Sequence, residues 1–122
     1  MSKELHYSKD RHKRVKETAE VFTPTELVQK MLDDLDIDWE NPPKDKTFLD
    51  PTVGSGQFLV ELAKRGIPAK NLYGVDIMPD NIETCKKRLQ NVLGDDSETL
   101  YWIDRNIVQG DALTFDYEGY WE

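Results

Sequence analysis

The chain has 122 residues, of which 38% are hydrophobic and 33% charged, with a formal net charge of −8. This length suits one small domain, and the composition is that of a soluble globular protein. No apolar run approaches the roughly 20 residues that span a bilayer, and the first residues lack the apolar core of a signal peptide. Cys85 is the single cysteine, which excludes a disulfide scaffold and a cysteine-ligated metal cluster. We therefore expect a cytoplasmic protein that does not enter a membrane.

The charge is unevenly distributed along the chain. Residues 1–16 carry six basic and two acidic side chains, a net charge of +4, which leaves −12 for the remainder. An acidic body disfavours non-specific nucleic-acid binding, whereas a basic arm can contact phosphates. A frayed, solvated terminus is the alternative interpretation of the same residues. We assign residues 1–19 to a basic N-terminal arm.

A helix is predicted to begin near Thr23. This residue suits the N-cap, Pro24 suits the first helical position, and Glu26 completes a Thr-x-x-Glu capping box. Apolar residues then follow at helical spacing: Leu27, Val28, Met31, Leu32 and Leu35. The helix start and the preceding Phe22 can flank a ligand or can simply begin an amphipathic helix, and the pattern alone leaves both interpretations open.

Residues 47–59 predict a strand, a glycine turn and a helix. An apolar run ends at Asp50, the chain turns through Gly54-Ser55-Gly56, and helical spacing begins at Phe58. Glycine lets a ligand come close to the backbone, and the N-terminus of the following helix favours an anionic or polar group. Asp50 stands at the carboxyl end of the strand, where open α/β sheets bind ligands. A cofactor site is the first hypothesis, and an ordinary strand-to-helix turn is the alternative.

Two further predicted strands also end in acids. Residues 71–77 contain Asp76, and residues 106–113 contain Asp111. Asp76 follows Gly56 by twenty positions, the separation at which nucleotide-binding βαβ units place a carboxylate that accepts hydrogen bonds from ribose hydroxyls. Because parallel strands end at the same edge of a sheet, we expect Asp50, Asp76 and Asp111 to converge on one crevice.

Glycine and proline mark the ends of the predicted helices. The helix after the glycine turn ends at Gly66, and a second helix opens at Pro79 and ends at Gly94. Residues 94–97 are predicted to form a loop. The apolar patch at residues 100–103 has no assignment from the sequence.

Four segments, in order, resemble the S-adenosylmethionine-binding half of DNA adenine-N6 methyltransferases. They are Val21-Phe22-Thr23-Pro24, Asp50-Pro51-x-x-Gly54-Ser55-Gly56-x-Phe58, Tyr73-Gly74-Val75-Asp76-Ile77 and Gly110-Asp111-Ala112. These segments correspond to the family's motif X and motifs I, II and III. The chain is most similar to the type I and Eco57I-like restriction-modification methylases and their phage-borne relatives.

The resemblance implies a fold, a cofactor and a partner. The fold is a truncated Rossmann-like class I methyltransferase fold of the α/β class, with three parallel strands and helices mainly on one face. It would occupy residues 20–115, with a tail at residues 116–122. The cofactor is S-adenosyl-L-methionine, and the partner is DNA.

The family's cofactor contacts are carried over position by position. Phe22, Thr23 and Pro24 would contact the methionine portion, and Asp50 would attract the ammonium group. Asp76 would bind the ribose, Ile77 would pack on the adenine face, and Asp111 would accept from the adenine amino group. The remaining cofactor residues are Gly54, Ser55, Gly56, Phe58 and Ala112.

The family's catalytic motif, Asp or Asn followed by Pro-Pro and an aromatic residue, lies on a fourth strand that this sequence does not contain, and the target-recognition region is also missing. Asn41-Pro42-Pro43-Lys44 is superficially similar, but Lys44 stands where an aromatic ring stacks on the target base. We assign no catalytic residue and no metal ligand. The first strand would be an open edge, so we expect a homodimer or a second subunit to supply the missing half.

Three other functions are compatible with parts of the pattern. One is a non-catalytic protein that keeps the methylase half-fold to bind the cofactor or to interfere with a partner enzyme. Another is a methyltransferase that acts on RNA, protein or a small molecule, which the basic arm does not distinguish from one that acts on DNA. The third is a dinucleotide-dependent oxidoreductase. Against the oxidoreductase, Leu59 stands where the Gly-x-Gly-x-x-Gly fingerprint needs its last glycine.

Overall fold

The sheet contains three short parallel strands, as the sequence predicted. They are β1 (Phe48–Asp50), β2 (Leu72–Asp76) and β3 (Ile107–Gln109). Their spatial order is β1-β2-β3, with Leu49 opposite Tyr73 and Val75 opposite Val108. The carboxyl ends of all three strands therefore lie at one edge of the sheet. The computed structural model describes residues 25–121, so the basic arm and the predicted residues Phe22, Thr23 and Pro24 lie outside the described part.

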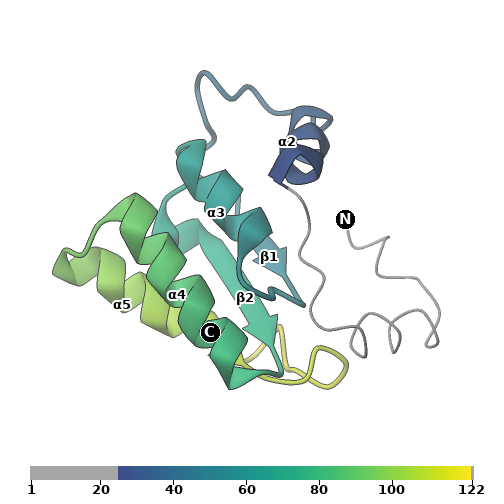
Figure 1. Cartoon of the computed structure of the whole chain (residues 1–122), viewed down its shortest axis with the longest axis vertical. Helices are drawn as coiled ribbons and strands as arrows, with labels where there is room; N and C mark the ends of the chain where they lie inside the picture. Colours follow the sequence, from purple (N-terminus) through teal and green to yellow (C-terminus); the bar gives the residue numbers. More distant parts are fainter. Residues whose placement is uncertain (1–24, 122) are drawn as a thin grey trace.

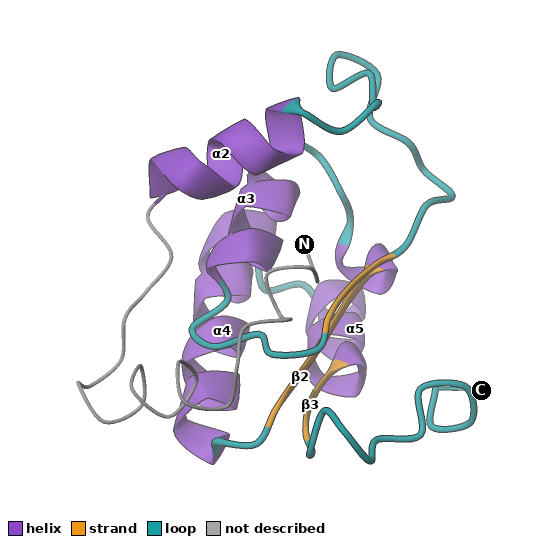
Figure 2. Ribbon diagram, turned by 90° about the vertical axis from the view of Figure 1, so that its right-hand side faces the viewer, coloured by secondary structure: helices purple, strands orange, loops and turns teal. Residues whose placement is uncertain are grey.

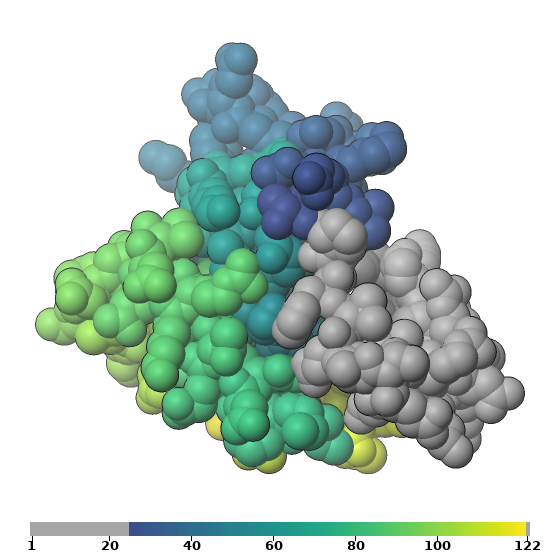
Figure 3. All heavy atoms as spheres, viewed as in Figure 1, coloured from purple at the N-terminus to yellow at the C-terminus, as the bar shows by residue number. Residues whose placement is uncertain are grey.

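Helices cover mainly one face of this sheet. They are α2 (Thr25–Asp33), α3 (Gln57–Lys64), α4 (Pro79–Leu93), α5 (Ser97–Asn106) and the short 3-10 helix η2 (Ala69–Asn71). Figure 1 shows α3 and α4 in front of the strands, and the turned view of Figure 2 places both helices on the same side of the sheet. In the space-filling view, α4 and α5 form a continuous surface beside α3 (Figure 3). None of the helices between residues 25 and 121 is long and apolar enough to cross a membrane.

The core lies between the sheet and helices α3 and α4. Strand residues alternate between faces, so Leu72 and Ile107 point toward the helices, where both are fully buried. They meet apolar residues of the helices that are also inaccessible to solvent, namely Leu59, Leu62, Cys85 and Leu89. Burial of this apolar surface stabilises the packing of the helices on the sheet by about 25 cal/mol per Å² removed from water.

Helix α5 was not predicted. Residues 94–97 were expected to form a loop and residues 100–103 had no assignment, yet a helix begins at Ser97. Its cap is Asp96, whose Oδ2 accepts a hydrogen bond from the Thr99 amide at 3.2 Å. The helix buries Ile103 and Asn106, and the Asn106 amide group donates to the carbonyl groups of η2 residues Ala69 and Lys70. The signal that was missed is Asp96, a helix-capping acid that precedes apolar residues at helical spacing.

The C-terminal segment covers part of the second face of the sheet. Residues 116–121, assigned above to a tail, run on the side opposite α3 and α4 (Figure 2). The ring of Trp121 meets Tyr73 edge-on at 4.9 Å and also packs against Phe115. Trp121 Nε1 donates to the Arg105 carbonyl at 3.1 Å, and the Arg105 guanidinium donates to the Trp121 carbonyl. Leu49 remains 41% exposed, so the β1 side of this face is the bare part.

The Asn41-Pro42-Pro43-Lys44 segment lies far from the strand ends that were expected to form the site. Pro42 Cγ is 2.8 Å from the position that a Cβ on Gly66 would take, just beyond the C-terminus of α3. Because α3 begins at the glycine turn, its C-terminus lies at the opposite end of the sheet from that turn. The segment is therefore a connecting loop that lies away from the expected site.

The glycine turn is packed tightly against α4. Gly56 has a φ of +93°, and a Cβ built on it would lie 2.7 Å from Cys85 Sγ and 3.3 Å from Cys85 Cα. Both distances are shorter than a Cβ normally tolerates, so a side chain at residue 56 requires Cys85 or α4 to shift. Gly54 has a φ of +56°, but among residues 25–121 the nearest atom to a Cβ there would be the Thr52 carbonyl oxygen at 4.0 Å. The two glycines therefore have different roles. The missing side chain of Gly56 allows α4 to pack closely against the turn, whereas that of Gly54 leaves open space beside the loop backbone.

We expect Gly56→Ala to destabilise the protein by about 2 to 4 kcal/mol, because a clash with α4 adds to the backbone strain. Gly54→Ala is the matched control and should cost about 1 kcal/mol, because only the strain of a left-handed residue is present. Urea unfolding followed by circular dichroism measures both values. Equal losses in the two variants would contradict the close approach of α4 to the turn.

Candidate functional site

The glycine loop, residues 51–56, folds over the carboxyl ends of β1 and β2. Its backbone is held by one hydrogen bond to β2, from the Val53 amide to the Val75 carbonyl at 2.9 Å, and by one within the loop, from the Gly56 amide to the Val53 carbonyl at 2.8 Å. A third bond, of 2.9 Å, runs from the Gly54 amide to Asp76 Oδ2. The loop and the two strand ends therefore form one connected unit.

Asp50 is a half-buried carboxylate at the end of β1. Its Oδ1 accepts a hydrogen bond from the Thr52 amide at 3.1 Å. Burial raises the pKa of Asp50 to about 6, and the negative charge of Asp76 contributes to the increase, although the Thr52 bond opposes it. A carboxyl group with too little solvation and a carboxylate neighbour is a favourable site for a ligand cation.

Asp76 is the most extensively bonded acid of the site. Besides the Gly54 bond, its Oδ1 accepts from the Met78 amide at 2.8 Å and from Asn81 Nδ2 at 3.2 Å. A carboxylate offers about four acceptor positions, so three donors leave about one open. Asp76 thus links the glycine loop to the first turn of α4, and it retains limited capacity for a ligand.

The end of β3 is tied to the end of β2. The Gly110 amide donates to the Asp76 carbonyl at 3.0 Å, and Gln109 Nε2 donates to the Ile77 carbonyl at 3.1 Å. Ile77 is 51% exposed beside this junction, so an apolar side chain is presented to solvent next to Asp76. Asp111 follows the junction, and its exposed carboxylate accepts from the Leu113 amide at 2.9 Å.

Several predicted site residues have structural partners here. Ser55 Oγ is 3.2 Å from the Arg88 guanidinium of α4, and Phe58 packs against the core. The Ala112 carbonyl accepts from the Tyr117 hydroxyl at 2.8 Å. The geometry therefore bonds Gly54 to Asp76 and places Asp50 at the end of the adjacent strand, whereas the Ser55 side chain is turned toward α4.

Two residues near the loop were not predicted from the sequence. Asn81 contacts the Asp76 carboxylate, and Arg88 contacts the glycine loop and the start of α3. Both lie on α4 among polar residues at helical spacing, and no motif marked them. Cys85, between them, is fully buried against Gly56, and this burial raises the pKa of its thiol to about 12.

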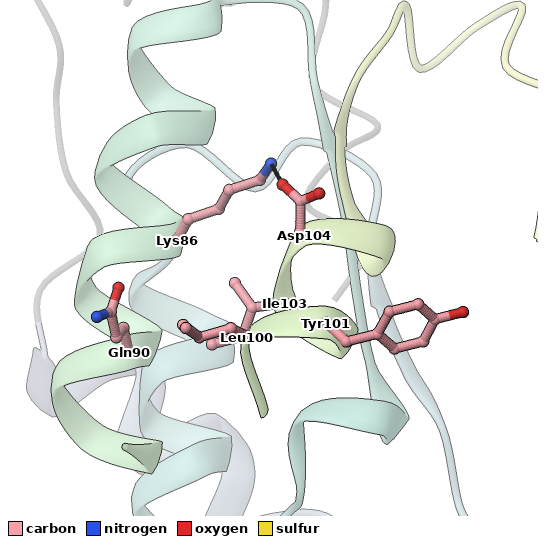
Figure 4. Close-up of a pocket in the computed structure, with 6 residues that line it drawn as sticks. All are labelled: Lys86, Gln90, Leu100, Tyr101, Ile103 and Asp104. Carbon is pink, nitrogen blue, oxygen red and sulfur yellow. Dashed lines mark hydrogen bonds and ion pairs between the residues drawn. The ribbon is translucent and has the colours of Figure 1, made fainter. Parts of the chain in front are cut away.

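A separate groove lies between α4 and α5, on the outer surface. It has a volume of about 440 Å³, and its lining residues are Lys86, Gln90, Leu100, Tyr101, Ile103 and Asp104. Figure 4 shows Lys86 extending across its rim to Asp104, to which it pairs at 2.8 Å. None of the strand-end acids lines this groove, so it is distinct from the candidate site.

Asp50→Asn should stabilise the unliganded protein. The pKa of about 6 lies above the ordinary value of 3.8, so ionisation of Asp50 opposes folding, and its cost grows as the pH rises from 4 to 6 and is constant above. Removing that charge should add up to about 3 kcal/mol near pH 7.5 and roughly half of that near pH 5. Urea unfolding at both pH values measures the gain. Asp45→Asn, at an exposed position in the connection before β1, is the control and should give no gain; a destabilised Asp50→Asn protein would contradict the burial argument.

Comparison with known proteins identifies the family. The profile of the N-6 DNA Methylase family matches residues 6–116. The Type II methyltransferase M.VspI of Vibrio sp. (strain 343) is 34% identical over 100 residues, which cover 80% of this chain and 21% of that protein. The 2-phytyl-1,4-naphtoquinone methyltransferase of Trichormus variabilis (strain ATCC 29413 / PCC 7937) is 31% identical over 88 residues, 66% of this chain and 38% of that protein.

The chain spans about a fifth and about two fifths of the lengths of these two relatives. No solved structure matches the chain. The family match nevertheless covers most of the sequence, including the glycine loop and all three strand ends. Together with the parallel sheet and the acids at its carboxyl edge, it establishes that this chain belongs to the N-6 DNA Methylase family.

Proposed function

We propose that this chain binds S-adenosyl-L-methionine and forms the cofactor-binding part of a DNA adenine-N6 methyltransferase of the restriction-modification type. The observation that carries the proposal is the meeting of Asp50, Asp76 and the open side of Gly54 at the ends of adjacent strands. The family membership supplies the reaction class. The opposed charges of the cofactor and these acids supply the physical reason for binding.

Asp50 would hold the ammonium group of the cofactor. Its carboxylate is poorly solvated and repelled by Asp76, so a bound cation offsets both costs at once. The sulfonium centre adds a second positive charge to the same ligand. The site therefore favours a cationic nucleoside over a dinucleotide, whose pyrophosphate would add negative charge to a carboxylate-lined crevice.

Asp76 would accept hydrogen bonds from the ribose hydroxyls. A diol brings two donors, whereas about one acceptor position of this carboxylate is open. Binding would therefore exchange one of the three present donors for a hydroxyl, and the Gly54 amide belongs to the loop that the ligand would contact. Ile77 would pack on the adenine ring, and Asp111 would accept from its amino group.

The methyl acceptor would be bound by other parts of the enzyme. Adenine methylation needs groups that hold the extruded base in line with the sulfonium methyl. Between residues 25 and 121, the one segment that is similar to such a motif, Asn41-Pro42-Pro43-Lys44, packs at the other end of the sheet. A further region or a second subunit would supply the base-binding groups and the contacts to DNA.

Calorimetry with S-adenosyl-L-methionine and, separately, with NAD tests the cofactor assignment. We expect binding of the first and none of the second. Asp76→Ala should weaken binding at least tenfold, because hydrogen bonds to a charged group contribute about 1.5 to 3 kcal/mol. Asp104→Ala, which removes an exposed carboxylate paired with Lys86, should leave affinity unchanged. Binding of NAD alone, or equal affinities of the wild-type and Asp76→Ala proteins, would refute the assignment.

The affinity for S-adenosyl-L-methionine should depend on pH through Asp50. The ligand cation binds the ionised form, so affinity should fall as the pH drops below the pKa of about 6. Between about pH 7 and pH 5 the decrease should be roughly tenfold, with uptake of a proton on ligand release. Titrations in two buffers of different ionisation enthalpy measure both effects. Asp50→Asn should bind weakly at every pH; a pH-independent wild-type affinity would remove Asp50 from the site.

A further inference from the structure

Arg88 of α4 makes three hydrogen bonds to the glycine loop and the residue that begins α3. Its Nη1 donates to the Ser55 carbonyl and to Ser55 Oγ, both at 3.2 Å. Its Nη2 donates to Gln57 Oε1 at 3.0 Å. The guanidinium group thus spans two positions of the chain with a planar arrangement of donors.

These bonds fix one peptide unit at both ends. The Ser55 carbonyl accepts from Arg88, and the amide of the same peptide unit, on Gly56, donates to the Val53 carbonyl at 2.8 Å. Gly56 itself cannot move toward α4, because Cys85 already lies against it. On the other side of the loop, Asp76 holds the Gly54 amide. The loop is therefore clamped from β2 at one end and from α4 at the other.

The acceptors of Arg88 are themselves held in place. Gln57 Nε2 donates to Glu61 Oε2 at 3.2 Å, which fixes the amide orientation that presents Oε1 to Arg88. Glu61 is only 2% exposed, and its other oxygen accepts from Gln29 of α2 at 3.3 Å. A continuous polar network thus connects α4, α3 and α2 beneath the loop.

We propose that Arg88 is a positioning residue of the methyl-donor site, an inference that rests on the proposed function. It holds residues 55–57 in the conformation that receives the donor, and it does not touch the donor. If the loop samples other conformations without Arg88, only a fraction of molecules is competent to bind, and the apparent affinity falls by that fraction. Lysine does not replace it, because one ammonium group cannot bond Ser55 and Gln57 in this forked geometry.

The test compares Arg88→Met and Arg88→Lys with Lys86→Met. Lys86 is on the same helix and carries the same charge, but it pairs with Asp104 of α5 and does not contact the loop (Figure 4). We expect both Arg88 variants to bind S-adenosyl-L-methionine at least tenfold more weakly than the wild type, and Lys86→Met to bind within twofold of it. Millimolar methylguanidinium should partly restore binding to Arg88→Ala, which a general loss of packing would not allow.

Amide hydrogen exchange of residues 54–57 in the unliganded proteins provides a readout that needs no ligand. Exchange should be faster in Arg88→Met and unchanged in Lys86→Met. Gln57→Ala removes the side-chain acceptor of Arg88 Nη2, so it should weaken binding and speed exchange of residues 54–57, and its loss of affinity should be non-additive with that of Arg88→Met. If the Arg88 variants do not fold, Gln57→Ala alone decides, because unchanged affinity and unchanged exchange in this variant would overturn the positioning role.

The outcomes separate the two proposals. Failure of the wild-type protein to bind S-adenosyl-L-methionine would overturn the proposed function, while the exchange measurement would still report whether Arg88 orders the loop. Binding by the wild type together with near-normal affinity of Arg88→Met would overturn the positioning role alone. Weak binding with unchanged loop exchange would also overturn it.

Discussion

The approach of α4 to the glycine turn is the constraint on which the rest of this structure depends. With no side chain at Gly56, Cys85 of α4 lies directly against the loop backbone. This contact fixes the position of the N-terminus of α3, and so it fixes the position of the glycine loop over the carboxyl ends of β1 and β2. It also brings Arg88 and Asn81 within reach of the loop and of Asp76. One missing Cβ thus determines both the helix packing and the shape of the site.

The acids of the candidate site lower the stability of the unliganded protein. Asp50 is ionised at neutral pH in a place that disfavours its charge, and Asp76 stands near it with the same sign. Such strain persists because the surrounding sheet and helices over-determine the positions of both acids. The unliganded protein carries the repulsion, and under the proposed function the ammonium group of the cofactor would relieve it. In that case function and folding make opposite demands on the same carboxyl group.

Local patterns predicted the sheet and its acids because these signals reside in short segments. Each strand is a short apolar run closed by an acid, and the loop is marked by glycines whose dihedrals only glycine readily adopts. Helix α5 escaped prediction because its apolar face is short and its aromatic residues Tyr101 and Trp102 suggest a strand as readily as a helix. Arg88 could not be found at all, since its role arises from a contact with Ser55, 33 positions away in the chain. The packing of Trp121 on the second sheet face likewise depends on tertiary contacts that no local sequence pattern predicts.

The C-terminal aromatic segment has a consequence for synthesis of the protein. The helices can pack on their face of the sheet once β3 has formed, whereas Tyr73 on the second face is covered only when the ring of Trp121 packs against it. Until that residue has left the ribosome, the nascent chain displays an uncovered apolar surface beside a strand edge. Such surfaces recruit chaperones and pair with neighbouring nascent chains. Premature termination just before Trp121 would therefore leave a polypeptide whose helix-covered face is packed and whose second sheet face is prone to aggregation.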